Sequence, residues 1–286
     1  MKDFKGKTAF VTGAASGIGL GLTRALLDRG MNVMMADVEQ AALDAAAHGL
    51  SNYGDRVARV TVDVAVGEAM AEAARRTFET FGKVHVLCNN AGVSRVGRVE
   101  DIALSDWEWV IGVNLYGTLH GIRAFLPHMK AHGEDSHIVS TSSMSGLVPK
   151  ALAGPYGTTK FGIVGLSHVL REELAGSNVG VSVLCPGWVR TNMPNNGRNR
   201  PARFGGPLSM ADDPLFAERN RHYLENAARG LDPLDAAALV VRAIEENEFY
   251  IVTEPGRRGD VEKRYDEIMR AFDAVDARLP DMRKAG

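Results

Sequence analysis

The stretch Thr8-Ala-Phe-Val-Thr-Gly-Ala-Ala-Ser-Gly-Ile-Gly19 decides the fold of this chain. It begins as a short apolar run, typical of a buried strand, and continues into a turn with glycines at positions 13, 17 and 19, after which a helical pattern starts. Glycines in this arrangement let the chain turn tightly and bring backbone N–H groups close to a pyrophosphate. The following helix directs the positive end of its dipole toward the phosphates. A strand, a glycine-rich turn and a helix in this order therefore predict a dinucleotide-binding site.

The rest of the chain repeats the alternation of strand and helix. Most apolar runs are nonpolar nearly throughout, as in strands buried on both faces of a parallel sheet. The order predicts an α/β protein: a single-domain Rossmann fold with a doubly wound, seven-stranded parallel sheet, flanked by helices on both faces. We expect strands at Thr8–Thr12, Asn32–Asp37, Arg59–Asp63, Val84–Asn89, His137–Thr141, Gly180–Cys185 and Phe249–Thr253, and helices near 17–29, 39–50, 66–81, 105–132, 155–176 and 233–246.

The composition is that of a globular protein and excludes several functional classes. Hydrophobic residues make up 45% of the 286 residues, and the net charge of −2 gives no electrostatic attraction to nucleic acid or an anionic membrane. No apolar run approaches the roughly 20 residues of a membrane span, and we expect no signal peptide before the first strand. Cys88 and Cys185 lie in strand-like runs and are expected as reduced core thiols of a cytoplasmic protein. No metal site is expected, because His128 and His132 have no acidic ligand in a metal-binding pattern with them.

Two segments interrupt the alternation. Residues 192–232 begin with many turn formers and continue with scattered apolar residues, which favours a lid over a ligand site. Beyond the core, apolar residues recur at helical spacing over 258–276. This helix either packs on its own domain or covers an active site, its own or a neighbour's. We therefore expect a dinucleotide-binding and catalytic domain over 1–255, including the lid, and a helical extension over 256–286.

Polar residues follow the ends of the later strands. Asp37 lies eighteen residues after Gly19, where a carboxylate can accept hydrogen bonds from the adenosine ribose 2′-hydroxyl and repel a 2′-phosphate. No Arg or Lys occupies positions 14–16 or 38, so NAD is favoured over NADP. Asp63-Val64 can bound an adenine pocket, and Asn89-Asn-Ala-Gly92 ends in small residues that let the backbone approach a ligand.

Tyr156 and Lys160 are four residues apart, so they share one face of a helix. A lysine ammonium at about 4 Å from a phenol, at an effective dielectric of about 20, favours the phenolate by about 4 kcal/mol, or roughly three pK units. The pKa of Tyr156 would then lie near neutrality, where a phenol can exchange protons with an alcohol or a ketone. Taken alone, the pair is more typical of an ordinary amphipathic helix, because Tyr-x-x-x-Lys is a common spacing.

Together, these motifs resemble the short-chain dehydrogenase/reductase family. The shared residues follow the family's order and spacing over about residues 5–255. They are Thr12-Gly-x-x-x-Gly-Ile-Gly19, Asn89-Asn-Ala-Gly92, Asn114 in Val113-Asn-Leu-Tyr-Gly117, Ser143, Tyr156-x-x-x-Lys160 and Pro186-Gly-Trp-Val-Arg-Thr191.

The resemblance implies a division of roles. Tyr156 is the expected general acid/base on the substrate oxygen, and Ser143, rather than Ser142, is expected to hydrogen-bond that oxygen. Lys160 is expected to lower the pKa of Tyr156 and to hold the nicotinamide ribose, while Asn114 supports Lys160 through a water. The implied NAD contacts are Gly13, Ser16, Gly17, Ile18, Gly19, Asp37, Asp63, Val64, Asn90, Ala91, Gly92, Tyr156, Lys160, Pro186, Gly187, Val189 and Thr191.

Substrate contacts are expected from Ser94, Ser145, Leu147, Trp188 and Met193, which are mostly apolar or small and suit a bulky hydrophobic or aromatic molecule. Arg190, Arg198, Arg200 and Arg203 cluster near the lid. They either capture an anionic group of the substrate or form a solvated basic loop.

The expected function is NAD-dependent hydride transfer between a secondary alcohol, or its ketone, and nicotinamide. The alternatives are an NADP-dependent 3-oxoacyl or carbonyl reductase and, from another class, a dinucleotide-binding sensor or scaffold without catalysis. The resemblance also implies a homodimer or homotetramer.

Overall fold

A single parallel sheet organises the protein, which is described here from a computed structural model covering the backbone of residues 1–208, 225–226 and 228–284. The sheet has seven strands in the order β3-β2-β1-β4-β5-β6-β7, and every neighbouring pair is parallel. The strands are β1 (Thr8–Thr12), β2 (Asn32–Asp37), β3 (Val57–Thr61), β4 (Val86–Asn89), β5 (Ser136–Thr141), β6 (Val179–Cys185) and β7 (Tyr250–Val252). The predicted doubly wound Rossmann fold is confirmed, with strand ends shifted by up to two residues.

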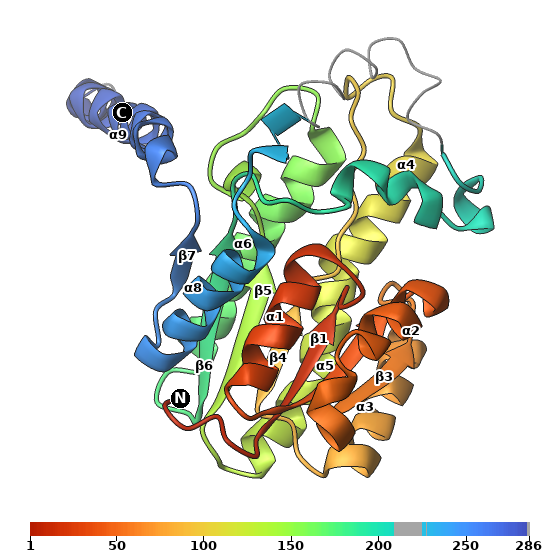
Figure 1. Cartoon of the computed structure of the whole chain (residues 1–286). Helices are drawn as coiled ribbons and strands as arrows, with labels where there is room; N and C mark the ends of the chain where they lie inside the picture. Colours follow the sequence, from red (N-terminus) through yellow and green to blue (C-terminus); the bar gives the residue numbers. More distant parts are fainter. Residues whose placement is uncertain (209–224, 227, 285–286) are drawn as a thin grey trace. The chain divides into compact units, whose positions relative to one another are not determined.

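Helices cover both faces of this sheet (Figure 1). The helices of the main unit are α1 (Gly17–Asp28), α2 (Gln40–His48), α3 (Gly67–Phe81), α4 (Leu104–Ile111), α5 (Gly117–Ala131), α6 (Gly154–Glu173) and α8 (Pro233–Glu246). Short 3-10 turns connect them: η1 (Ser51–Arg56), η3 (Met144–Gly146), η4 (Met193–Asn199) and η5 (Ala202–Phe204).

Alternate residues of the central strands feed two separate cores. Ala9 and Val11 of β1 pack with apolar residues of α1, α2 and α8, whereas Phe10, between them, packs with residues of α3, α5 and α6. Successive side chains of a strand point to opposite faces, so each strand contributes to both layers. This burial on both faces explains why the strands are apolar nearly throughout.

The helix predicted over 105–132 differs from the observed structure. It consists of α4 and α5 joined by one π-helical segment, η2 (Gly112–Tyr116), which contains the buried Asn114. The wider turn leaves backbone groups and side chains out of the regular helical register, and such segments occur often at functional sites. Apolar periodicity does not signal this feature.

The last residues form a unit of their own. Residues Met1–Thr253 form one compact unit and Glu254–Gly286 a second. The second contains η7 (Pro255–Arg257) and the helix α9 (Arg258–Lys284), which extends beyond the predicted 258–276. Whether the apolar side chains of α9 pack on their own domain or cover an active site stays a prediction. Among the described residues, no helix has both the length and the apolar character needed to cross a lipid bilayer.

A buried histidine lies in the amino-terminal half of β5. The Oγ of Ser182 donates to the carbonyl oxygen of Glu248 at 2.6 Å, so the Nε2–H of His137 donates to Ser182 Oγ at 2.7 Å. A Cβ on the neighbouring Gly180 would lie only 2.4 Å from His137 Nδ1, so the imidazole leaves no space for a side chain at position 180. Burial lowers the pKa of His137 to about 3 from 6.5.

We therefore expect His137 to weaken the fold as the pH falls below 6.5 toward 3, because the unfolded chain binds a proton there that the folded chain excludes. The unfolding free energy then falls by at most about 1.4 kcal/mol per pH unit. Urea unfolding between pH 7 and 5 should show a shallower decline for His137→Gln than for the wild type. His48→Gln, on the exposed end of α2, is the control and should keep the wild-type slope. Equal slopes for His137→Gln and the wild type would contradict the assignment.

Candidate active site

A groove runs along the carboxyl ends of the strands, where the strand order reverses between β1 and β4. Open parallel sheets bind ligands at this switch point. The groove is lined by nearly every residue predicted to contact a cofactor; only Gly19 lies outside the lining. The predicted residues in the lining are Gly13, Ser16, Gly17, Ile18, Asp37, Asp63, Val64, Asn90, Ala91, Gly92, Tyr156, Lys160, Pro186, Gly187, Val189 and Thr191.

The glycine turn forms part of the groove wall. Gly13 has a φ of +66°, and a Cβ there would lie 3.0 Å from Ala91 Cα. Gly17 has a φ of +51°, and a Cβ there would lie 2.9 Å from the Thr191 side chain. Gly19 is pressed against the turn, since its Cβ would lie 2.0 Å from the Gly13 carbonyl oxygen. The three glycines thus bring the start of α1 to the groove, with backbone where a pyrophosphate can approach.

Asp37 ends β2 and faces the groove from a fixed position. Its Oδ2 accepts a hydrogen bond from the Ala15 N–H at 3.0 Å, and its Oδ1 accepts one from the Glu39 N–H at 3.1 Å. These bonds tie the carboxylate to the glycine turn on one side and to the start of α2 on the other. Both oxygens keep lone pairs for a ligand hydroxyl.

The predicted acid/base residues meet in the same groove. Tyr156 and Lys160 lie on α6, and the Lys160 Nζ is 5.4 Å from the centre of the Tyr156 ring. Lys160 Nζ donates to the carbonyl oxygen of Thr141 at 2.8 Å. Ser143 follows β5, and its Oγ accepts a hydrogen bond from the Ser145 N–H at 3.1 Å. The adjacent Ser142 instead donates to the Lys160 carbonyl oxygen at 2.7 Å, which holds α6 against the end of β5.

Burial is the largest influence on the pKa values of Tyr156 and Lys160. It raises the pKa of Tyr156 above 10, although a hydrogen bond with Ser143 acts in the opposite direction. Burial also lowers the pKa of Lys160 from 10.5 to about 8. The direction for Tyr156 is thus opposite to the lowering of the pKa that the four-residue spacing suggested, and burial is its largest cause. The Lys160 ammonium donates to the Thr141 carbonyl oxygen.

Asn114 lies behind the groove rather than in its lining. Its Nδ2 donates to the Val93 carbonyl oxygen and to Thr159 Oγ1, both at 3.0 Å, and its Oδ1 accepts from the Val93 N–H at 2.8 Å. Asn114 thus connects the π-helical segment to α6 and to the loop after β4. A Cβ on Gly92 would lie 3.4 Å from Asn114 Oδ1 and 3.5 Å from Lys160 Nζ, so the two side chains approach the same small space.

The predicted substrate residues separate into two groups. Trp188 and Met193 line the groove, whereas Ser94, Ser145 and Leu147 are not part of its lining. Ser94 is instead bound to the segment after β6: its N–H donates to Asn196 Oδ1 at 3.1 Å, and Asn196 Nδ2 donates to Ser94 Oγ at 3.3 Å. Sequence reasoning missed several lining residues that carry no motif, namely Val38, Glu39, Val62, Val93, Trp109, Thr141, Asn192, Asn196, Asn199 and Pro201.

Each of the four arginines near the predicted lid has an acidic partner elsewhere in the chain. Arg200 is buried, with its Nε 2.9 Å from Asp106 Oδ1 of α4, in an ion pair whose alignment is poor for a hydrogen bond. The other three pairs are more exposed and join Arg190 to Asp232, Arg198 to Glu39 and Arg203 to Asp63. Arg198, Arg200 and Arg203 therefore fasten residues 192–208 of the predicted lid to the domain. Capture of an anionic group of the substrate stays a prediction.

His85, His132 and Glu134 gather at the opposite edge of the sheet, within reach of a common metal ion. However, His85 Nδ1 accepts a hydrogen bond from the Thr8 N–H at 3.1 Å, so the proton of the neutral ring is on Nε2, which faces Glu134 Oε2 at 2.9 Å. His132 Nε2 donates to the Val84 carbonyl oxygen at 3.0 Å. The expectation that His132 has no acidic neighbour is therefore wrong, and the three side chains form a hydrogen-bond network with the backbone around the starts of β1, β4 and β5.

The comparison with protein-family models gives one match, to the short chain dehydrogenase family, over residues 7–202. The chain belongs to this family. The resemblance inferred from its motifs is thereby confirmed, and the protein is an oxidoreductase of the short chain dehydrogenase family.

Individual relatives match over nearly the whole chain. The C alpha-dehydrogenase of Sphingobium sp. SYK-6 is 34% identical, over 94% of this chain and 87% of its own length. The 1-deoxy-11-beta-hydroxypentalenate dehydrogenase of Streptomyces exfoliatus is 33% identical, over 92% of this chain and 89% of its own. Among solved structures, a short chain dehydrogenase/reductase from Burkholderia phymatum in complex with NAD superposes with a TM-score of 0.90 at 36% identity, covering 95% of this chain and 97% of that one.

The buried ammonium of Lys160 should give the stability of the protein a distinct alkaline pH dependence. Because burial lowers its pKa from 10.5 to about 8, the unfolded chain holds a proton over this interval that the folded chain releases. The wild-type unfolding free energy should therefore gain a contribution that rises from pH 8 to 10.5, and Lys160→Met should lack it. Urea unfolding at pH 7 to 10 measures the difference, with Lys130→Met, an exposed position on α5, as the control. A Lys160→Met curve parallel to the wild type would contradict the effect.

Proposed function

We propose that this protein is an NAD-dependent dehydrogenase that transfers a hydride between a secondary alcohol, or its ketone, and nicotinamide. The observation that carries the proposal is the meeting, in one groove, of the glycine turn and Asp37 with Ser143, Tyr156 and Lys160. A dinucleotide can contact both sets of residues at once, since its adenosine half and its reactive half are joined by the pyrophosphate.

The residues present fit this cofactor. Side chains at positions 13 and 17 would fill the space beside Ala91 and Thr191, so glycine there leaves room for a pyrophosphate against the backbone. Asp37 would hold the adenosine ribose, and Lys160 and Thr191 the nicotinamide half. When bound, NAD supplies the hydride acceptor and, in its oxidised form, a positive charge near Tyr156.

The proton steps fall to the protein. In the oxidation direction Tyr156 takes the hydroxyl proton of the substrate, and Ser143 donates a hydrogen bond to the same oxygen. Burial opposes the phenolate, so the neighbouring Lys160 ammonium and the charge of oxidised NAD are needed to bring the pKa of Tyr156 down. Asn114 acts on this group indirectly, through Thr159 and the space beside Gly92 that it shares with Lys160.

A bulky hydrophobic or aromatic substrate fits the groove. Val93, Trp109, Trp188 and Met193 contribute apolar surface to the lining. The name of one relative, a 1-deoxy-11-beta-hydroxypentalenate dehydrogenase, supports a substrate that carries a hydroxyl group. We infer an aryl alcohol or a fused-ring hydroxyl compound as the substrate class.

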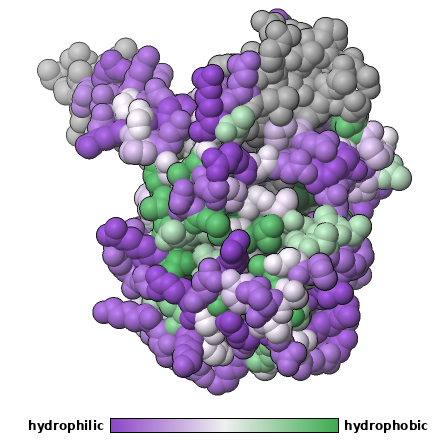
Figure 2. Space-filling model, in the orientation of Figure 1, coloured by the Kyte–Doolittle hydropathy of each residue, from purple (hydrophilic) through white to green (hydrophobic). Residues whose placement is uncertain are grey.

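A homodimer or homotetramer in the cytoplasm is part of the proposal. Hydrophobic residues are visible among hydrophilic ones on the face shown in Figure 2. Leu104 of α4, Tyr116 of η2 and Val169 of α6 are at least half exposed, which favours helix contacts with a second copy. The two cysteines, Cys88 and Cys185, are buried and free, as suits a reducing compartment.

Two other functions have less support. An NADP-dependent 3-oxoacyl or carbonyl reductase would have to place a 2′-phosphate beside the fixed carboxylate of Asp37. A non-catalytic sensor or scaffold would not need Ser143, Tyr156 and Lys160 together in the groove.

Tyr156→Phe should abolish turnover and leave NAD affinity within about threefold of the wild type, because only the proton-transferring oxygen is removed. Acid/base groups supply about 10²- to 10⁴-fold of rate. The measurement is NADH absorbance with a panel of secondary alcohols that includes aryl alcohols and hydroxysteroids, with NAD and NADP each tested. More than about a tenth of the wild-type rate in Tyr156→Phe would exclude this role. NAD binding by the wild type without turnover of any alcohol would favour the sensor.

Asp37→Ala should relax the cofactor preference, because it removes an acceptor for the ribose 2′-hydroxyl and a charge that repels a 2′-phosphate. We expect the ratio of kcat/KM for NAD to that for NADP to fall by about tenfold or more, the effect of one charged hydrogen bond. Thr61→Ala, on the neighbouring β3 and outside the groove lining, is the control. Equal use of NAD and NADP by the wild-type protein would refute the role of Asp37.

A further inference from the structure

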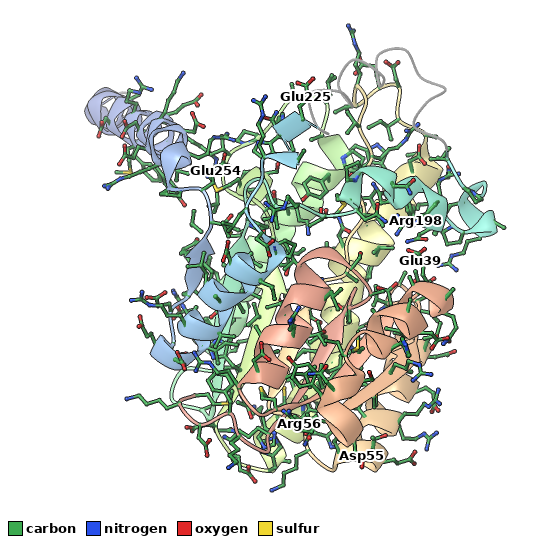
Figure 3. The ribbon with its side chains drawn as sticks, viewed as in Figure 1. Glu39, Asp55, Arg56, Arg198, Glu225 and Glu254 are labelled. Atoms are coloured by element: carbon green, nitrogen blue, oxygen red, sulfur yellow. The ribbon has the colours of Figure 1, made fainter. Side chains whose placement is uncertain are left out.

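A cationic side chain reaches the adenosine end of the groove from a distant part of the chain. Arg198 of η4 forms a two-pronged ion pair with Glu39, in which Nε donates to Oε2 at 3.1 Å and Nη2 donates to Oε1. Asn199 Nδ2 donates to the same Oε1 at 2.8 Å. Figure 3 shows Arg198 and Glu39 next to each other, although 159 residues separate them in sequence.

Glu39 stands beside the residue expected to select the cofactor. It lies two positions after Asp37, and its N–H donates to Asp37 Oδ1 at 3.1 Å. Both residues and Arg198 belong to the lining of the groove. The ion pair therefore lies on the side of the groove where a ribose 2′-hydroxyl, or a 2′-phosphate in its place, would meet the protein.

Without a partner, Arg198 would favour a phosphate at this position. Guanidinium groups bind phosphates through two parallel hydrogen bonds. Among the described lining residues, Arg198 and Lys160 are the only lysine or arginine side chains, and Lys160 lies beside Tyr156. Glu39 occupies the Nε and Nη2 donors that a phosphate would use. Although burial alone raises the pKa of Glu39, its hydrogen bonds with Arg198 and Asn199 bring it below the ordinary value, so the carboxylate is charged at neutral pH.

Other contacts hold the Arg198 segment at this end of the groove. Arg198 Nη1 donates to the carbonyl oxygen of Asn195 at 2.6 Å, within the same 3-10 turn. Arg203 Nη2 donates to Asp63 Oδ2 at 2.8 Å, on the far side of the adenine region, and Arg200 is buried against Asp106. Arg198 therefore stays near the groove when the charge of Glu39 is removed.

We propose that Glu39 is a second specificity-determining residue for the cofactor, which keeps a 2′-phosphate out of the groove by engaging the guanidinium of Arg198. This inference rests on the proposed use of NAD. Asp37 discriminates by direct contact with the ribose. Glu39 discriminates by pairing with the Arg198 guanidinium, which would otherwise bind the 2′-phosphate.

Binding of NAD and NADP to Glu39→Gln tests the proposal by isothermal titration calorimetry, which needs no substrate. Glutamine keeps the shape of the side chain and removes its charge, and no helix cap is lost, since the Glu39 side chain caps no N–H of α2. We expect the Kd for NADP to fall by about tenfold, the effect of one charged hydrogen bond, and the Kd for NAD to change by less than about threefold.

Two further variants separate this mechanism from a general change of charge or of structure. In Glu39→Gln/Arg198→Gln the gain in NADP affinity should disappear, because the cation that binds the phosphate is gone. Glu72→Gln on α3 removes a carboxylate that is also paired with an arginine, Arg75, but lies outside the groove lining, and it should leave both affinities at their wild-type values.

The outcomes are distinct. Unchanged NADP affinity in Glu39→Gln, an equal loss of affinity for both cofactors, or a gain that persists without Arg198 would each overturn the proposal while leaving NAD as the cofactor. A wild-type protein that binds neither cofactor, or NADP as well as NAD, would overturn the proposed cofactor, and this inference with it.

Discussion

The hydroxyl of Thr12 joins the two strands between which the sheet reverses its order, and the site depends on this junction. Its Oγ1 accepts hydrogen bonds from the N–H groups of Asn90 and Ala91 at 2.8 and 3.0 Å, and Asn90 Nδ2 donates to the Thr12 carbonyl oxygen at 3.0 Å. The end of β1, with its glycine turn, is thereby held against the end of β4. The connections that follow β1 and β4 leave on opposite faces of the sheet, which opens a crevice at this edge. Thr12 holds the first residues of these two connections together at the base of the groove.

Much of the fold was accessible from the sequence because burial on both faces leaves a strong apolar signal in each strand. Six motifs then located the groove, since each lies at a strand end or on the helix that follows. The π-helical segment around Asn114 was not accessible, because a single widened turn does not alter the apolar pattern of the helices on either side. The direction in which the protein shifts the pKa of Tyr156 also escaped prediction. Spacing reveals that Lys160 is near, but not that its ammonium is bound to the Thr141 carbonyl oxygen.

The ion pairs of the segment after β6 could not be predicted from the sequence. Its arginines formed a visible cluster, yet their partners are Glu39, Asp63, Asp106 and Asp232, which come from four different parts of the chain. Neither charge counting nor periodicity pairs residues over such separations. The same applies to Ser94, whose hydrogen bonds with Asn196 join residues that are 102 positions apart.

The four arginine pairs differ in exposure, and this difference makes the segment sensitive to ionic strength in an uneven way. The side chains of Arg200 and Asp106 are 7% and 6% exposed, whereas those of Arg203 and Asp63 are 48% and 26% exposed. Dissolved ions screen exposed charges over a Debye length of about 8 Å at physiological salt, but screen buried pairs much less. Added salt therefore loosens the contacts at the adenosine end while the attachment to α4 persists. The segment is thus held to α4 by an ion pair that salt weakens little, and to Asp63 by one that salt weakens more.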